Sequence, residues 1–305
     1  GGVEVVDPEL VVLAMPTSQL SAVIDHENQL NPQSTFIDVG SVKNEVVLHV
    51  ESISGLSRRF VPTHPMAGRE IGGAGSARAD LFQGRSWILT PSAELQPQSK
   101  DLALKLIAQL GASPIELSAT DHDQAVARIS HLPQIAASLI AKQLTGTPAE
   151  WMELAGQGLR DTTRIAASDE SLWKEIIFSN RAELEQLLIN LQNDLGAMIA
   201  GLDDPEKIAA LIAAGRAGRA LIPGKHGGKA REYSYLPIVI DDKPGQLGAI
   251  FNECAAMEVN VEDLNIEHSP GQLSALITLA LSQTDAEKLS SHLSSIGWNV
   301  HPIRK

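Results

Sequence analysis

The run Leu10-Val11-Val12-Leu13-Ala14-Met15 is apolar without interruption. Such a run predicts a strand buried on both faces, because a half-buried strand alternates apolar and polar residues. Pro16-Thr17-Ser18 follows directly and ends the strand, and Thr17 or Ser18 could cap a helix that extends to about Leu30. The sequence therefore predicts a buried strand joined at once to a helix.

The same alternation continues along the chain. A second strand is predicted at Thr35-Phe36-Ile37-Asp38, a helix ends near Val50, and a third strand follows at Phe60-Val61-Pro62-Thr63. Strands that alternate with helices are typical of a parallel α/β sheet, which binds its ligands at the carboxyl ends of the strands. Those ends are Met15-Pro16-Thr17, Gly40-Ser41 and His64-Pro65. A strand at 86–90, a helix at 98–110 and a strand at 114–117 complete this region, which we expect to span residues 1–118.

Residues 119–221 have a helical pattern throughout. Thr120 with Asp123 resembles a capping box, and apolar residues then recur near the helical period. Pro133 is expected to kink this helix. A longer helix is predicted over 172–202, with one apolar stripe made by Leu184, Leu187, Leu188, Leu191 and Leu195.

Residues 222–232 are rich in Gly, Lys and Pro and predict a linker. The strands and helices predicted after it, over 233–305, follow in the order βαββαβ, a split βαβ arrangement. The turn Asp241 to Leu247 joins its first strand to its first helix, and a later strand is expected from Val259 to His268.

Composition excludes several classes of protein. The 305 residues carry a formal net charge of -13, which argues against a nucleic-acid binder, since phosphate contacts need a basic surface. One cysteine, Cys254, permits neither an intrachain disulfide nor a cysteine-based zinc site. No apolar run is long enough to span a bilayer, and no signal-peptide pattern occurs. We therefore expect a cytoplasmic protein that does not bind membranes.

Each candidate motif also has a structural interpretation. His64 directly precedes Pro65. One interpretation is a general base, because the ordinary pKa of histidine suits proton transfer near neutral pH; the other is an inert loop histidine. In Asp38-Val39-Gly40-Ser41-Val42-Lys43, the glycine would serve the turn, Ser41 would cap a helix and Lys43 would lie in solvent. His131 beside Pro133 could line a cleft or donate to a freed carbonyl.

Two arginines four residues apart form the last motif. In Arg160-Asp161-Thr162-Thr163-Arg164-Ile165-Ala166, the arginines could clamp a carboxylate, or form salt bridges with Asp161 and Asp169.

In order, these segments closely resemble the prephenate dehydrogenase family, which includes arogenate and cyclohexadienyl dehydrogenases. The likeness covers residues 8–220 and includes two further segments, His64-Pro65-Met66-Ala67-Gly68-Arg69-Glu70 and Leu81-Phe82-Gln83-Gly84-Arg85-Ser86-Trp87. From Tyr233 onward, with Asp242-Lys243-Pro244-Gly245-Gln246-Leu247, the chain resembles an ACT domain, a small α+β ferredoxin-like module that senses amino acids.

The resemblance implies an α/β Rossmann-type domain, an all-α dimerisation domain that forms a homodimer, and a regulatory domain. The implied reaction is oxidative decarboxylation of prephenate to 4-hydroxyphenylpyruvate and CO2 in tyrosine biosynthesis, with NAD or alternatively NADP. Arogenate dehydrogenase, which yields tyrosine directly, is the alternative. No metal is needed, because aromatisation of the ring drives the decarboxylation.

The resemblance also assigns the site residues. His64 matches the family's catalytic base, and Ser41 matches the serine that holds the substrate hydroxyl or the nicotinamide. Arg164 matches the arginine that clamps a substrate carboxylate, with Arg160 as its rival. His131 and Glu70 match residues of the substrate pocket. The expected cofactor-binding residues are Met15, Pro16, Thr17, Gly40 and Ser41, and the expected amino-acid effector site, for which tyrosine is the first candidate, comprises Asp242, Gly245, Leu247 and Asn260.

The front of the chain departs from the family pattern. No G-x-G-x-x-G turn precedes Leu10, although a dinucleotide domain should open with one. Residues 10–15 resemble the family's fourth strand, so the first βαβ unit is missing, by truncation or because its residues are not included. We expect the second, because half a sheet would expose a long apolar edge.

Two other functions remain open. A regulatory protein without catalysis would keep the fold and sense an amino acid through residues 233–305. A hydroxyacid-type dehydrogenase would use a lysine on a helix as its base, and the sequence places no such lysine.

Overall fold

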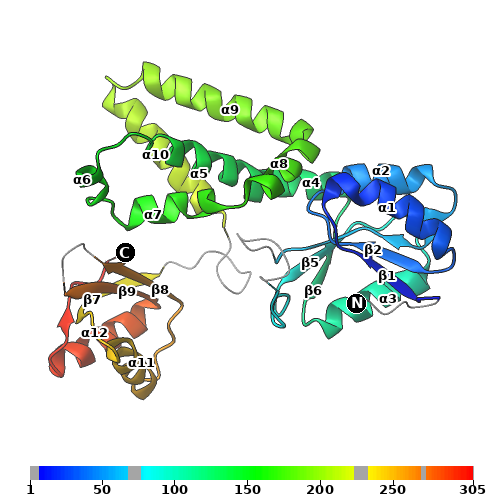
Figure 1. Ribbon diagram of the computed structural model, residues 1–305. Helices are drawn as coiled ribbons and strands as arrows, with labels where there is room; N and C mark the ends of the chain where they lie inside the picture. Colours follow the sequence, from blue (N-terminus) through cyan, green and yellow to red (C-terminus); the bar gives the residue numbers. More distant parts are fainter. Residues whose placement is uncertain (1–6, 68–76, 223–232, 269–272, 305) are drawn as a thin grey trace. The chain divides into compact units, whose positions relative to one another are not determined.

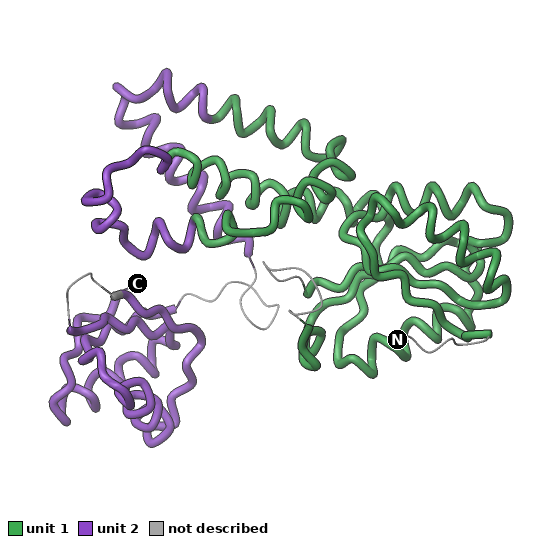
Figure 2. The backbone as a smooth tube through the Cα atoms, viewed as in Figure 1, with its two compact units in different colours: residues 1–143, 163–194 green, residues 144–162, 195–305 purple. Residues whose placement is uncertain are grey.

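The computed structural model describes residues 7–67, 77–222, 233–268 and 273–304 of the chain. They belong to two compact units, coloured separately in Figure 2. Unit 1 contains residues 1–143 and 163–194, and unit 2 contains residues 144–162 and 195–305.

Unit 1 opens with the predicted parallel sheet. Its strands are β1 (Leu10–Leu13), β2 (Thr35–Asp38) and β3 (Phe60–Val61), in the order β1-β2-β3, with both pairs parallel. Helices α1 (Thr17–Leu30) and α2 (Asn44–Ser52) connect them. The carboxyl ends of these strands therefore meet at one edge of the sheet, as the sequence predicts.

A second three-stranded sheet follows. It contains β4 (Thr63–Pro65), β5 (Ser86–Leu89) and β6 (Ser113–Glu116); β4 pairs antiparallel with β5, and β5 pairs parallel with β6. The prediction of one strand over 60–63 was wrong, because Pro62 has no N–H to donate to a ladder and the chain changes sheets there. His64 consequently lies in a strand, paired with Ile88, and not in a loop.

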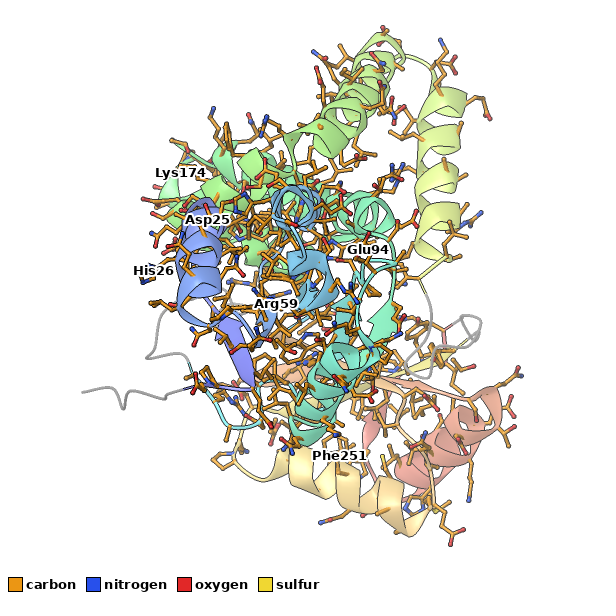
Figure 3. The ribbon with its side chains drawn as sticks, turned by 90° about the vertical axis from the view of Figure 1, so that its right-hand side faces the viewer. Asp25, His26, Arg59, Glu94, Lys174 and Phe251 are labelled. Carbon is orange, nitrogen blue, oxygen red and sulfur yellow. The ribbon has the colours of Figure 1, made fainter. Side chains whose placement is uncertain are left out.

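Helices cover both faces of the first sheet (Figure 1). On one face α1 and α2 pack over Leu13, Phe36 and Phe60. On the other face α3 (Pro97–Gln109) packs Ala103 and Ile107 against the strands. Coverage on both faces explains the fully buried apolar run of β2. The prediction that β1 is buried on both faces was wrong, because β1 is the outermost strand of this sheet among the described residues and Val12 is 46% exposed. The outer side of α1 is polar, and Asp25 and His26 are exposed on it (Figure 3).

The helical part of unit 1 starts with α4 (Ala119–Val126), a π-helical turn η3 (Ala127–His131) and α5 (Leu132–Lys142). The π turn lies directly before Pro133, which cannot make the normal hydrogen bond to residue 129 because proline has no N–H. The capping box was misplaced by two residues. Ser118 is the N-cap, and its Oγ accepts from the backbone N–H of Asp121.

The long helix predicted over 172–202 is two helices. They are α8 (Glu170–Ser179) and α9 (Arg181–Ala200), separated at Asn180. Asn180 is buried, and its side chain bonds to groups on other helices, so the break has a tertiary cause that periodicity cannot show. A 3-10 turn, η4 (Arg164–Ala167), precedes α8.

Unit 2 contains α6 (Ala149–Met152), most of α7 (Gln157–Thr163), the end of α9 and α10 (Pro205–Arg219). Within the described ranges, no helix is both long enough and apolar enough to cross a membrane.

The C-terminal part of unit 2 has the predicted βαββαβ order. Its elements are β7 (Ser234–Asp241), α11 (Gln246–Ala256), β8 (Asp263–His268), β9 (Ser274–Leu281), α12 (Gln283–Ser295) and β10 (Asn299–Val300). They form an antiparallel sheet of order β10-β7-β9-β8, with α11 and α12 packed on one face. β8 begins at Asp263, so the prediction that its strand starts at Val259 was wrong, and Asn260 precedes it.

Candidate active site

The end of β2 is a buried ionic cluster. The Lys43 ammonium is fully buried, pairs with the Asp38 carboxylate and donates to the Thr63 carbonyl at 2.8 Å. The backbone N–H groups of Gly40 and Thr63 also donate to Asp38, at 2.9 and 3.0 Å. Burial lowers the pKa of Lys43, and Asp38 opposes that shift. The interpretation of Lys43 as a solvent-exposed residue was therefore wrong.

Gly40 and Ser41 follow this strand end. A Cβ on Gly40 would come within 2.9 Å of the Asp38 Oδ2, so glycine is required by close approach. Ser41 does not cap α2, whose N-cap residue is Lys43. The first turn of α2 is held instead by the Asp123 carboxylate, which accepts the backbone N–H groups of Lys43 and Asn44 at 2.8 Å each.

His64 contacts a second histidine that the motif analysis did not select. Its Nδ1 lies 2.8 Å from Nε2 of His122, with the rings nearly perpendicular. The His122 Nδ1 lies 2.7 Å from Oδ1 of Asp123, and both of these residues are fully buried. Burial lowers the pKa of His64 well below 6.5, and His122, Lys43 and His131 lower it further. His64 is therefore a neutral imidazole at pH 7.

His131 comes from the π turn and is 2% exposed. Its Nδ1 lies 3.0 Å from Nδ2 of Asn180, and its ring meets the edge of Trp173. Burial lowers the pKa of His131 to about 4, although Asp123 opposes the shift. His131 is therefore also neutral at pH 7.

A pocket of about 310 Å³ brings together three of the predicted site residues. Its lining includes Ser41, His64, Ser130, His131, Gln134 and Trp173. All of them belong to unit 1. A serine hydroxyl and two neutral imidazoles on a partly apolar wall can orient a small polar ligand and accept a proton from it.

The two arginines of the last motif are placed differently. Arg164 begins η4 and directly precedes Ile165, a pocket residue whose carbonyl accepts from Gln134 at 2.9 Å. Arg160 belongs to unit 2, where its Nη2 lies 3.5 Å from the Ala155 carbonyl. Glu70 lies outside the described residues.

Met15, Pro16 and Thr17 follow β1, as Gly40 and Ser41 follow β2. Because these two strands are parallel neighbours, the five expected cofactor-binding residues lie at the same sheet edge. Pro16 is the N-cap residue of α1, and no side-chain hydroxyl caps that helix.

The expected effector residues lie in the C-terminal part of unit 2. Gly245 has φ +90 and is the N-cap residue of α11, and Leu247 is 40% exposed in the first turn of that helix. The Asp242 N–H donates to the Leu273 carbonyl, whereas the Asn260 side chain donates to Glu262. A pocket of about 310 Å³ in this part lies on the sheet, beside Tyr235, and not at the 241–247 turn.

Comparison with known proteins gives two adjoining matches. Residues 3–116 match the family model "Prephenate dehydrogenase, nucleotide-binding domain", and residues 118–211 match "Prephenate dehydrogenase, dimerization domain". The chain belongs to the prephenate dehydrogenase family. It is thus an oxidoreductase with a nucleotide-binding α/β domain, a helical dimerization domain and a C-terminal region of antiparallel sheet and helices.

Similar proteins extend over most of the chain. A probable prephenate dehydrogenase, NovF of Streptomyces niveus, is 27% identical over 303 residues, covering 95% of this chain and 84% of that protein. Prephenate dehydrogenase of Bacillus subtilis is 24% identical, covering 91% and 77%. The structure of A. aeolicus prephenate dehydrogenase with hydroxyphenyl propionate and NAD+ aligns with a TM-score of 0.61 and 26% identity, covering 71% of this chain and 77% of that one.

Sequence reasoning missed His122, Asp123 and Asn180. The first two lie in a segment interpreted only as a helix cap, and Asn180 lies inside a predicted helix. Adjacent histidine and aspartate beside a helix start were the available signal for the first pair.

Proposed function

We propose that this protein is a prephenate dehydrogenase, which converts prephenate to 4-hydroxyphenylpyruvate and CO2 with NAD, or alternatively NADP. The observation that carries the proposal is the pocket in which the neutral His64 faces the same space as Ser41 and His131. A neutral imidazole can accept a proton at pH 7, which is what oxidation of a carbinol requires.

Each pocket residue has a separate role in the proposed reaction. His64 accepts the proton of the ring hydroxyl while hydride leaves the same carbon, and the ring carboxylate then departs as CO2 with aromatisation. Ser41 holds that hydroxyl or the nicotinamide. His131 contacts the side chain of the substrate and Arg164 binds a carboxylate. Glu70, which lies outside the described residues, is included on the resemblance alone.

The cofactor would bind at the edge where β1 and β2 end. Met15, Pro16 and Thr17 on one strand and Gly40 on the next would hold it, and Ser41 connects that edge with the pocket. The residues present fit a nucleotide, because two parallel strand ends and a helix start converge there. Bound NAD+ or NADP+ supplies the hydride acceptor.

A matrix of rate assays tests the proposal. Prephenate and arogenate are each offered with NAD+ and with NADP+, and reduced cofactor is followed by absorbance. We expect turnover with prephenate, and a roughly 10²–10⁴-fold loss in the His64→Asn variant, the usual contribution of a well-placed base. Turnover with arogenate alone would make the protein an arogenate dehydrogenase. Absence of turnover with either substrate would favour a non-catalytic regulator.

We also propose that residues 233–305 form an ACT domain that binds an amino acid, with tyrosine first, and lowers activity. Its βαββαβ order and the glycine start of α11 support this, because free amides at a helix start bind carboxylates. Calorimetry and rates of the whole chain with tyrosine, phenylalanine and tryptophan test it. Absence of heat and of inhibition would leave the domain structural.

The remaining assignments complete the proposal. The domain boundaries 1–118, 119–221, 222–232 and 233–305, the homodimer and the cytoplasmic location belong to it as well. The family matches over 3–116 and 118–211 support the first two domains and the homodimer, and the βαββαβ order supports the last domain.

A further inference from the structure

Asp123 connects both pocket histidines. Its carboxylate accepts the backbone N–H groups of Lys43 and Asn44, so it is fixed against the start of α2. An ionised aspartate has only acceptors, so the third contact, at 2.7 Å, must be donated by Nδ1 of His122. If the His122 imidazole carries a single ring proton, that proton is the one on Nδ1, and its Nε2 is then an acceptor.

The same reasoning fixes the proton of His64. Its Nδ1 lies 2.8 Å from the His122 Nε2; with that nitrogen as the acceptor, the Nδ1 of His64 carries the ring proton and donates it. The nitrogen left without a proton is Nε2. A chain of two hydrogen bonds thus sets which nitrogen of the pocket histidine is basic.

The contacts of His131 place its ring proton on the other nitrogen, Nε2. The Asn180 Nδ2 donates to the backbone carbonyl of Asp123 at 2.9 Å, which identifies it as the amide nitrogen. The same nitrogen lies 3.0 Å from Nδ1 of His131, so that ring nitrogen accepts. The proton of His131 is therefore on Nε2. One buried residue gives the pocket a basic imidazole at position 64 and a hydrogen-bond donor at position 131.

We propose that His122, with a single ring proton on Nδ1, and Asp123 are positioning residues that hold His64 with its own ring proton on Nδ1, so that Nε2 is free to accept the substrate hydroxyl proton. The inference rests on the proposed function. As the O–H bond of the substrate breaks, the lone pair of the His64 Nε2 forms the new N–H bond. The carbon that bears this hydroxyl gives its hydride to the cofactor.

The arrangement also suits the product of that step. Protonated His64 keeps its Nδ1–H bond to His122, which in turn donates to the Asp123 carboxylate. The buried Lys43 ammonium opposes the new positive charge, and its pairing with Asp38 reduces that opposition. The same logic of an acid orienting a histidine operates in other enzymes, where a wrong tautomer costs up to about 10⁴-fold in kcat.

Nitrogen NMR of the whole protein, labelled with ¹⁵N at its histidine rings, tests the tautomers directly and needs no substrate. His64→Asn and His131→Asn identify the two resonance pairs by their loss. We expect a protonated Nδ1 in His64 and a protonated Nε2 in His131. A protonated Nε2 in His64 would overturn the inference, even in a protein that turns over prephenate.

Kinetics test whether His122 acts through His64. His122→Leu should lower kcat roughly 10²–10⁴-fold with little change in KM, and His122→Gln, whose amide oxygen can accept from Nδ1 of His64, should restore part of it. In the His64→Asn background, His122→Leu should cost almost nothing further. Additive losses, or equal losses for Leu and Gln, would overturn the inference.

The matched control is His292→Gln. The hydrogen bond between His292 and Glu253 is 2.7 Å long, the same length as the one between His122 and Asp123. His292 lies on α12, which contributes no residue to the pocket lining. We expect its kcat to be unchanged. Failure of the proposed function would appear as absence of turnover in the unmutated protein, whatever the tautomers are, so the two failures are distinguishable.

Discussion

At the residue scale, burial decides the charge of the pocket histidines, and this gives a pH dependence. Burial, together with His122, Lys43 and His131, holds the pKa of His64 well below 6.5, so the base stays neutral until the pH falls through that lowered value. We expect the acid limb of kcat/KM, which reports the free enzyme, to lie below pH 6.5. A pH profile with its acid limb at or above 6.5 would contradict the environment described for His64.

The two arginines give a second prediction at this scale. Arg164 directly precedes the pocket residue Ile165, whereas Arg160 does not adjoin a lining residue, so Arg164→Ala should raise KM more than Arg160→Ala does. Loss of a charged partner costs about 1.5–3 kcal/mol, or roughly 10- to 140-fold. Steady-state kinetics with each alanine variant measure the difference. If Arg160→Ala raises KM more than Arg164→Ala does, then Arg160 is the arginine that binds the carboxylate, and the assignment to Arg164 was wrong by one helical turn.

The sequence motifs indicated which residues would lie near the pocket, but they did not indicate the hydrogen bonds and burial of those residues. Ser41, His64 and His131 meet in one pocket, as expected from strand ends and a helix kink. The role of Asp123 in holding the start of α2 could not be foreseen, because the groups that it accepts there are backbone N–H groups about 80 residues earlier, which carry no side-chain signal. Tertiary hydrogen bonds of this kind become visible only once the helix is placed.

At the element scale, the start of α4 provides a discriminating stability test. Ser118 accepts from the Asp121 N–H, whereas the Thr120 hydroxyl makes only a 3.4 Å contact with Asn44. Ser118→Ala should therefore lower the free energy of unfolding by about 1 kcal/mol. Thr120→Ala, the matched control, should stay within about 0.5 kcal/mol of the unmutated protein. Urea unfolding measures both, and an equal or larger loss for Thr120→Ala would restore the capping box predicted from the sequence.

Elements were predicted well where one local rule governs them. The strands β1 and β2 and the helix α1 between them follow from apolar runs and breakers. The pattern failed where tertiary contacts intervene, since Asn180 interrupts an unbroken apolar period to bond to Asp123 and His131. At Pro62 the prediction failed for another reason. The sequence contains a strand-breaking proline there, but the predicted strand was drawn through it.

At the scale of the whole molecule, α9 carries an apolar surface that the described residues of the chain leave exposed. Leu191, Leu195 and Ile199 recur every four residues on one face and are 38%, 60% and 62% exposed. Fully burying each such side chain contributes about 1.5–3 kcal/mol, so a partner helix would gain substantially by covering the stripe. The match of residues 118–211 to a dimerization domain places this face inside the matched region.

We therefore expect the protein to sediment as a dimer at micromolar concentration. Replacing Leu195 and Ile199 together by Asp should shift it to monomer, because two buried charges would face an apolar partner surface. Asn193→Asp is the matched control, since it adds a charge to the opposite face of the same helix. Sedimentation velocity of the three proteins measures the outcome. A stable monomer of the unmutated chain, or equal dissociation by Asn193→Asp, would show that this stripe does not hold two copies together.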